Sequence, residues 1–322
     1  MSAWVARTPA SRSTPSGAPA TGRSRAGVTM TARRTGWFGV LCWMAGVLLL
    51  IVVLLPLASL LARTGLGGIA DALRQGDVRR SLLLTLGAAL TATVVTLVAG
   101  VPFSYLLARR SFPGRAVVES ALDLPVVVPH TAAGIALLTV YGREGIVGRA
   151  LAPLGITFTE SFAGIVVAMV FVSLPFLVSA SRQAFAQVDV RYEGVARTLG
   201  SSPFGAFVRV GLPLAWRGVA AGALMMWARG ISEFGAVVIL AYNPKVIPVL
   251  VFERFEGFGL DAALAPAALI VLVALVAFIA LRVLLAVNRR RIDRVSGRAA
   301  TGDEYDGVAD AVVRAEGADD QA

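Results

Sequence analysis

Cysteine, histidine and charge are all scarce in this chain of 322 residues. One cysteine, Cys42, excludes an intramolecular disulfide and any metal or iron–sulfur site built from clustered cysteines. One histidine, His130, excludes multi-histidine metal sites and argues against a Ser-His-Asp triad. Charged residues make up 16% of the chain, against roughly 25% in an average globular protein. With 57% hydrophobic residues and a mean hydropathy of +0.75, the chain cannot form the polar surface of a soluble enzyme.

The hydrophobic residues are gathered into long runs. Five runs lack Asp, Glu, Lys and Arg: 37–62, 81–108, 124–142, 161–181 and 262–281. A sixth, 212–240, is interrupted only by Arg217, Arg229 and Glu233. About 20 apolar residues in a helix cross the hydrocarbon of a bilayer, and no two-residue alternation suggests a barrel. The sequence predicts an all-α membrane protein with six transmembrane helices.

The basic residues predict the orientation of these spans. Segments 1–36, 109–118, 182–217 and 282–322 hold 21 of the 30 Lys and Arg residues, and the alternate segments 63–80, 143–160 and 241–261 hold 8. Because positive loops stay in the cytoplasm, we expect both termini there, as six spans require. The net charge of +10 is then explained without a nucleic acid, which we do not expect as a partner.

The two ends of the chain are polar. Residues 1–36 are rich in Ser, Thr, Arg, Pro and Gly and contain no acid, which predicts a disordered tail. An organellar transit peptide has a similar composition and stays an alternative. The following run, 37–62, exceeds the hydrophobic region of a signal peptide, so we expect an uncleaved first transmembrane helix. Residues 299–322 are acidic and also predict a disordered tail.

The polar segment 182–217 is too long for a simple connector. Asp189 can cap a helix, Gly200 can end it in a left-handed conformation, and Pro213 can open the next membrane helix. Between them an apolar stripe has helical spacing: Tyr192, Val195, Ala196 and Leu199. Such a helix could lie on the lipid surface, pack on the protein's own loops, or dock into a groove of a partner.

This segment resembles the coupling motif of ABC-importer permease subunits. That motif runs Glu-Ala-Ala, three residues, Gly, nine residues, Ile, any residue, Leu-Pro. Here Gly194-Val195-Ala196 takes the first place, Gly200 is the motif glycine, and residues 210–213 read Val-Gly-Leu-Pro. The motif glutamate is replaced by Gly194, and Glu193 stands one position earlier.

Two further stretches resemble one branch of that family. Residues 124–138 are similar to the third span of molybdate, tungstate and sulfate permeases, and residues 228–241 are similar to their Gly-Glu-Phe-Gly segment. The wording Gly-Ile-Ser-Glu-Phe-Gly, followed by Tyr-Asn-Pro, is nearest to the molybdate/tungstate branch. The chain is thus identified as a member of the molybdate/tungstate, sulfate-like oxyanion permeases.

The resemblance implies a type I ABC importer permease fold, with the permease core over 81–285 and the coupling segment at 182–217. It implies alternating access in the plasma (inner) membrane, driven by separate cytoplasmic ATPase subunits. The other implied partners are an extracytoplasmic oxyanion-binding protein, a second permease copy and membrane lipid. It assigns contact with the ATPase to the following residues: Tyr192, Glu193, Gly194, Val195, Ala196, Arg197, Leu199, Gly200 and Pro213.

Charged and polar residues inside the predicted spans are candidates for the translocation pathway. Arg229 and Glu233 are four residues apart and can meet on one helical face, because a lone charge at mid-membrane costs about 2.5–3.5 kcal/mol. Counting about 1.5 Å per residue from Leu212 places Arg229 roughly 26 Å along its span, towards the outer side. Such a pair could simply fix the helix, or Arg229 could attract an oxyanion. His130, which could instead bond a buried carbonyl, and the donors Thr131 and Ser232 complete this candidate set.

Other functions remain as alternatives. A phosphate loop of the Gly-x-x-x-x-Gly-Lys-Ser/Thr type is absent from the sequence, so we expect no ATPase site, no catalytic residues, no metal and no cofactor. A sulfate permease of the same class is the nearest alternative. A secondary transporter driven by an ion gradient would be supported by inverted repeats, and no clear internal repeat is found. A signalling or scaffold protein would show no flux.

Overall fold

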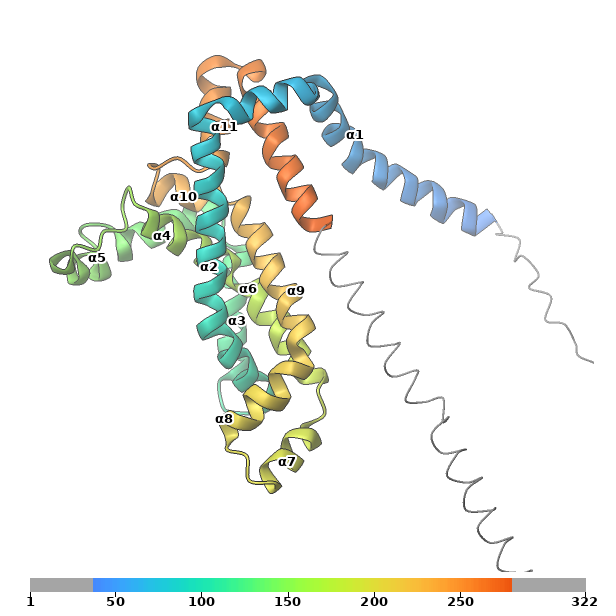
Figure 1. Ribbon diagram of the computed structural model, residues 1–322, viewed down its shortest axis with the longest axis vertical. Helices are drawn as coiled ribbons and strands as arrows, with labels where there is room; N and C mark the ends of the chain where they lie inside the picture. The colour runs from blue at the N-terminus through green and yellow to red at the C-terminus, as the bar shows by residue number, and fades with distance from the viewer. Residues whose placement is uncertain (1–36, 280–322) are drawn as a thin grey trace, which may run out of the picture. The chain divides into compact units, whose positions relative to one another are not determined.

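The computed structural model describes residues 37–279, which form helices and connecting loops without strands (Figure 1). The two predicted tails, 1–36 and 299–322, lie outside these residues. The chain divides after Val53 into two compact units. The first unit contributes the start of α1 (Trp37–Arg74), whose residues up to Val53 are exposed or half-exposed. The second unit begins at Leu54 and contains the rest of α1 and the later helices.

Five helices are long and apolar enough to cross a membrane, and a bent pair makes up to six. The five are α1, α2 (Gly76–Arg109), α6 (Phe162–Gln187), the continuous stretch Pro203–Ile231, and Leu260–Ile279. The prediction of an all-α protein with six spans is therefore confirmed, the sixth span being the bent pair. The predicted placement of the termini stays a prediction.

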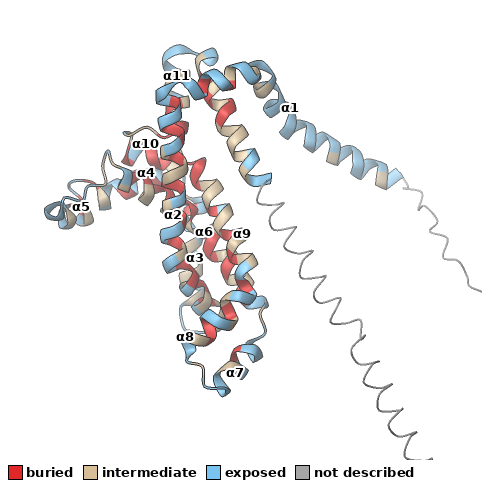
Figure 2. Ribbon diagram, in the orientation of Figure 1, coloured by how far each residue is buried: buried red, intermediate tan, exposed pale blue. Residues whose placement is uncertain are grey.

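Three helices, α2, α6 and α9 (Leu212–Ile231), form the core of the second unit. Buried residues concentrate where these helices meet (Figure 2). Gly222 lets α9 approach α6 closely, since a Cβ at Gly222 would lie 2.9 Å from the Cβ of Ala180. Gly218 meets Ala184 in the same way. These two glycines pack inside the chain.

The predicted third span is broken rather than continuous. α3 (Arg115–Val127) and α4 (His130–Tyr141) meet at a bend of 116°. Pro129 precedes the first residue of α4 with an extended ψ of 131°. Proline cannot donate a backbone hydrogen bond and holds the preceding residue extended, so the helix ends there. The short helices α5 (Ile146–Leu151) and η1 (Ala152–Leu154) follow.

The fifth span begins earlier and ends earlier than the run 212–240 predicts. Pro203 opens α8 (Pro203–Ala206), capped by Ser202, whose Oγ accepts from the Gly205 N–H at 3.0 Å. The π-helical segment η2 (Phe207–Gly211) joins it to α9. Pro213 stands at the second position of α9, as predicted for the start of a helix, but the ten residues 203–212 before it are already helical, so it does not open the continuous span. Pro213 has no N–H to donate to a carbonyl of the preceding turn. The wider π-helical turn of η2 stands at the place where this hydrogen bond is missing.

Two shorter helices complete the description. After α9 ends at Ile231, α10 (Gly235–Leu240) and α11 (Ile247–Phe258) run towards the end of α2 that carries Gly76 (Figure 1). The Ile247 N–H donates to the buried Thr85 hydroxyl at 2.8 Å, which holds the start of α11 against α2. At the opposite end of the bundle lie α7 (Val190–Thr198) and α8.

Candidate functional site

The predicted coupling helix is α7, and the sequence signals for its two ends are confirmed. Asp189 caps it, its carboxylate accepting from the Arg191 N–H at 2.9 Å. Gly200 has φ of +92°, the left-handed conformation that favours glycine after a helix. α7 is thus a separate short helix in the loop between α6 and α8.

A buried carboxylate holds α7 to the bundle. Glu193 is 5% exposed and accepts from the Tyr105 hydroxyl at 2.6 Å and from Arg109 Nη2 and Nε at 2.7 and 3.1 Å. Arg109 also donates to the Phe185 carbonyl at 2.9 Å. Because the carboxylate is paired and bonded on both oxygens, its burial is compensated.

Aromatic rings and a glycine shape the Glu193 pocket. The Tyr105 ring packs edge-on against Phe185 at 5.3 Å and against Phe207 at 4.8 Å between centroids. A Cβ on Gly211 would lie 3.0 Å from the Glu193 Oε1 atom, so glycine leaves the room that the carboxylate occupies. Sequence reasoning missed Tyr105 and Arg109. Their spacing, four residues apart at the end of an apolar run, is the only signal the sequence offered.

The other face of α7 is uncovered within the described residues. The apolar stripe predicted from the sequence is exposed: Tyr192 by 60%, Val195 by 58% and Leu199 by 83%. Ala196 is half-buried, whereas Gly194 and Arg197 are exposed. Packing of this stripe against the protein's own loops is therefore excluded for residues 37–279. A short helix with one anchored face and one exposed apolar face is suited to docking.

A second polar cluster joins α9 to the start of α4. Arg229 Nη2 lies 3.0 Å from Glu233 Oε2 and 2.6 Å from His130 Nε2. Arg229 Nη1 donates to the Ser232 hydroxyl at 3.3 Å. Four of the five pathway candidates thus meet, and the exposed Thr131 lies beside them without joining the contacts. The expected ion pair of Arg229 and Glu233 is present, and the partner of His130 is Arg229 rather than a carbonyl.

Close backbone packing positions His130. A Cβ on Gly235 would lie 2.7 Å from the His130 Cβ, and a Cβ on Gly134 would lie 2.8 Å from the Ile239 Cβ. These two glycines let α10 lie directly on α4. The Glu233 carboxylate is fully buried and accepts from the Ala236 N–H at 2.8 Å, which fixes it at the start of α10.

The contact with Arg229 fits one tautomer of His130. A guanidinium has donors only, so His130 Nε2 acts as the acceptor and Nδ1 carries the hydrogen. His130 Nδ1 is buried and has no hydrogen-bond partner among the described residues. The cluster therefore combines a neutralised arginine with an unused N–H donor.

This cluster lies deeper than counting along the sequence indicates. Gly230 packs on Ala89 and Ser173, which stand near the middles of α2 and α6. Arg229 thus sits at the level of the middle of the two long helices rather than towards their outer ends.

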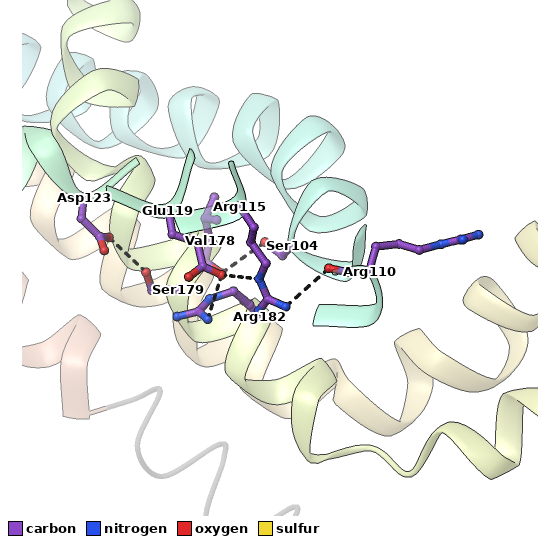
Figure 3. Close-up of polar contacts among 8 residues, drawn as sticks. All are labelled: Ser104, Arg110, Arg115, Glu119, Asp123, Val178, Ser179 and Arg182. Carbon is purple, nitrogen blue, oxygen red and sulfur yellow. Dashed lines mark hydrogen bonds and ion pairs between the residues drawn. The ribbon is translucent and has the colours of Figure 1, made fainter. Parts of the chain in front are cut away.

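A third polar group connects α3 to α6 (Figure 3). Glu119 Oε1 accepts from Arg115 Nε at 2.9 Å and from Arg182 Nη1 at 3.2 Å. One turn along α3, Asp123 accepts from the Ser179 hydroxyl at 3.4 Å. The sequence reasoning did not select these residues.

Ion pairs also close the end of the bundle opposite α7. Lys245 lies 2.7 Å from Glu253, and Arg254 lies 2.7 Å from Asp77 on α2. The hydrogen bond to the Glu253 carboxylate raises the pKa of Lys245 above its ordinary value, so the ammonium stays charged at neutral pH.

Comparison with known proteins agrees with this architecture. The chain is 37% identical over 243 residues to the molybdate/tungstate transport system permease protein WtpB of Pyrococcus abyssi, covering 74% of this chain and 91% of the relative. It is 43% identical over 196 residues to the protein of the same name from Thermococcus kodakarensis, covering 60% and 74%. The sulfate transport system permease protein CysT of Synechocystis is 34% identical over 249 residues, covering 75% and 87%.

The fold is also found among solved structures. A chain of a bacterial alginate ABC transporter, in complex with its alginate pentasaccharide-bound periplasmic protein, matches with a TM-score of 0.60 at 15% identity. The match covers 79% of this chain and 95% of that one. Residues 100–294 match the family described as the inner membrane component of binding-protein-dependent transport systems. The chain belongs to this family of multi-pass membrane permeases.

Proposed function

We propose that this chain is the permease subunit of an ATP-driven importer that carries molybdate or tungstate. The observation that carries the proposal is the geometry of α7: Glu193 fixes one face to α2, and the apolar stripe with Leu199 is left exposed. The names of the relatives from Pyrococcus and Thermococcus support the substrate. Sulfate is the near alternative within the same class.

ATP hydrolysis is assigned to separate subunits, because the sequence has no phosphate loop. Two such subunits would bind two copies of this chain, with α7 on the cytoplasmic side. A binding protein on the outer side would deliver the oxyanion and set most of the substrate choice. Tyr192, Val195 and Leu199 would enter a groove of the ATPase.

The proposed mechanism is alternating access. Closure of the ATPase pair on ATP moves the docked α7 helices together, and hydrolysis lets them separate. The Arg109–Glu193 pair transmits this displacement to α2, because a buried bonded pair does not slip as an exposed apolar contact can. The nucleotide state thereby biases which side of the membrane the pathway opens to.

The passage for the oxyanion would run beside the cluster of His130, Arg229 and Glu233. Arg229 supplies positive potential, and the His130 Nδ1–H supplies a donor with no partner of its own. Glu233 neutralises Arg229 when the pathway is empty, which keeps the cost of a charge at this depth small.

Co-purification and uptake by reconstituted protein test this function. The permease is expressed with its candidate ATPase and binding protein, as wild type and as Leu199→Arg. Leu154→Arg is the matched control, because Leu154 is also exposed, by 72%, and lies outside α7. We expect wild type and the control to retain the ATPase and to take up radiolabelled molybdate or tungstate on ATP. Leu199→Arg is expected to lose assembly or stimulated hydrolysis. Unimpaired coupling in Leu199→Arg, or uptake driven by an ion gradient without ATPase, would contradict the proposal.

A further inference from the structure

α3 has two chemically different faces. Arg115, Glu119 and Asp123 are spaced four residues apart, so they share one face within about 40° per step. Val117, Ala121 and Leu124 lie about 140–160° away from Glu119 around the helix axis. Figure 3 shows the charged face turned towards α6.

The charged face is bonded but not covered. Asp123 is exposed, and the side chains of Arg115, Glu119 and Arg182 are 33%, 28% and 30% exposed. α3 belongs to the bent helix pair that is apolar enough to cross a membrane. Charges in such a helix face a water-filled passage or a protein surface rather than lipid.

The same face leads towards the cluster in the middle of the bundle. α3 is 13 residues long, which is about 20 Å of helix. It runs from Arg115 to the break at Pro129, and His130 follows with its contact to Arg229. Charged groups therefore stand at both ends of this stretch, on α3 near the α7 end and at His130 and Arg229 at mid-depth, with the apolar residues 124–129 between them.

The two arginine clusters are built alike. Arg115 and Glu119 are paired four residues apart on α3, as Arg229 and Glu233 are at the end of α9. In both places a glutamate carboxylate forms an ion pair with an arginine that, if unpaired, would bind an anion tightly. A paired arginine attracts an anion with less affinity, because the carboxylate competes for the same donors. An anion that binds such a site weakly is released again quickly, as transport requires.

We propose that this face of α3, together with Arg182 of α6, lines the inner half of the oxyanion pathway. Arg182 is the cation that contacts the passing tetrahedral dianion, and Glu119 is the internal anion that the dianion displaces from it. This inference rests on the proposed function, and adds to it the residues between the mid-depth cluster and the α7 end.

Cysteine accessibility tests the lining. Cys42→Ala removes the chain's one cysteine, and Asp123→Cys is then introduced alone. Ala121→Cys is the matched control, since Ala121 is exposed but lies about 160° around α3 from Asp123. Each is assembled with the ATPase and binding protein in proteoliposomes. A membrane-impermeant cationic thiol reagent is added from the α7 side, with and without tungstate.

We expect Asp123→Cys to be labelled, and tungstate under turnover to slow its labelling several-fold. Ala121→Cys is expected to react slowly in both conditions. Equal labelling of the two positions, or labelling of Asp123→Cys that tungstate does not change, would overturn the inference. ATP-driven uptake by the Cys42→Ala parent is measured in parallel. If the parent takes up no oxyanion, the proposed function fails; if it does and protection is absent, only the inference about α3 fails.

A second variant series examines Arg182 directly. Arg182→Gln is expected to lower tungstate uptake several-fold while the complex still assembles and hydrolyses ATP, and Arg182→Lys is expected to recover most of the uptake. If Arg182 had only a structural role, Arg182→Gln would lower assembly as well as uptake, and Arg182→Lys would not restore uptake by itself. Normal uptake by an assembled Arg182→Gln complex would also overturn the inference.

Discussion

Arg109 Nη2 and Glu193 Oε1 meet at 2.7 Å across 84 residues of sequence, with both side chains at most 10% exposed. This pair joins the end of a transmembrane helix to α7, whose apolar stripe is exposed. In the proposed mechanism, this pair carries the movement of α7 to the bundle.

Glu193→Gln tests the pair without removing the shape of the side chain. Loss of the charge leaves Arg109 uncompensated in a nearly buried site, which costs about 3–5 kcal/mol where a buried pair is broken. We expect a lower unfolding temperature of the purified permease and a larger loss of uptake than of ATP hydrolysis. Glu144→Gln, at an exposed position, serves as the control. Unchanged stability and uptake in Glu193→Gln would show that the Arg109–Glu193 pair is not needed to transmit movement from α7 to α2.

Asp189 offers a second test of α7. Asp189→Ala removes the cap of the helix and is expected to destabilise it by about 1 kcal/mol, with a matching fall in stimulated ATP hydrolysis. Asp189→Asn retains a capping oxygen and should behave as wild type. Hydrolysis by the reconstituted complex is the measurement. Equal behaviour of alanine and asparagine would mean that the cap is dispensable once α7 is docked.

Variants of Arg229 can distinguish a structural role of its ion pair with Glu233 from a role in transport. Arg229→Gln leaves the fully buried Glu233 carboxylate without its cation, so we expect both stability and uptake to fall. The double variant Arg229→Gln/Glu233→Gln removes both charges and is expected to regain stability but not uptake. Thermal unfolding and ATP-driven uptake are compared for the three proteins. Recovery of uptake in the double variant would show that the Arg229–Glu233 pair has a structural role only.

Gly235→Ala tests how closely α10 must lie on α4. The added Cβ would stand 2.7 Å from the His130 Cβ, so His130 must shift away from Arg229 and we expect uptake to fall several-fold. Gly87→Ala, in α2, meets nothing within 4 Å and is expected to be neutral or to stabilise by up to about 1 kcal/mol. Normal uptake by Gly235→Ala would indicate that the His130–Arg229 contact is not needed.

The sequence predicted those features that depend on residues close together in the chain. The cap at Asp189, the left-handed Gly200 and the pairing of Arg229 with Glu233 are all contacts within one helix or its end. Hydropathy gave the helical class and the number of spans for the same reason, because each span satisfies its own backbone.

Contacts between distant segments were beyond the sequence. Nothing in the spacing of Tyr105 and Arg109 specifies Glu193 as their common partner. Pro129 accounts for a break in the helix, but the angle of 116° between α3 and α4 and the π segment before Pro213 were not predicted. The exposure of Leu199 likewise follows from which face of α7 Glu193 pulls inward.

The backbones of α6 and α9 are nearly in contact at Gly218 and Gly222. Because only the methyl groups of Ala180 and Ala184 lie between them, we expect these two helices to move together as one unit. A force applied near α7 would then displace them together. The joint between α3 and α4, where Pro129 already interrupts the helix, is then the place where we expect the angle between helices to change.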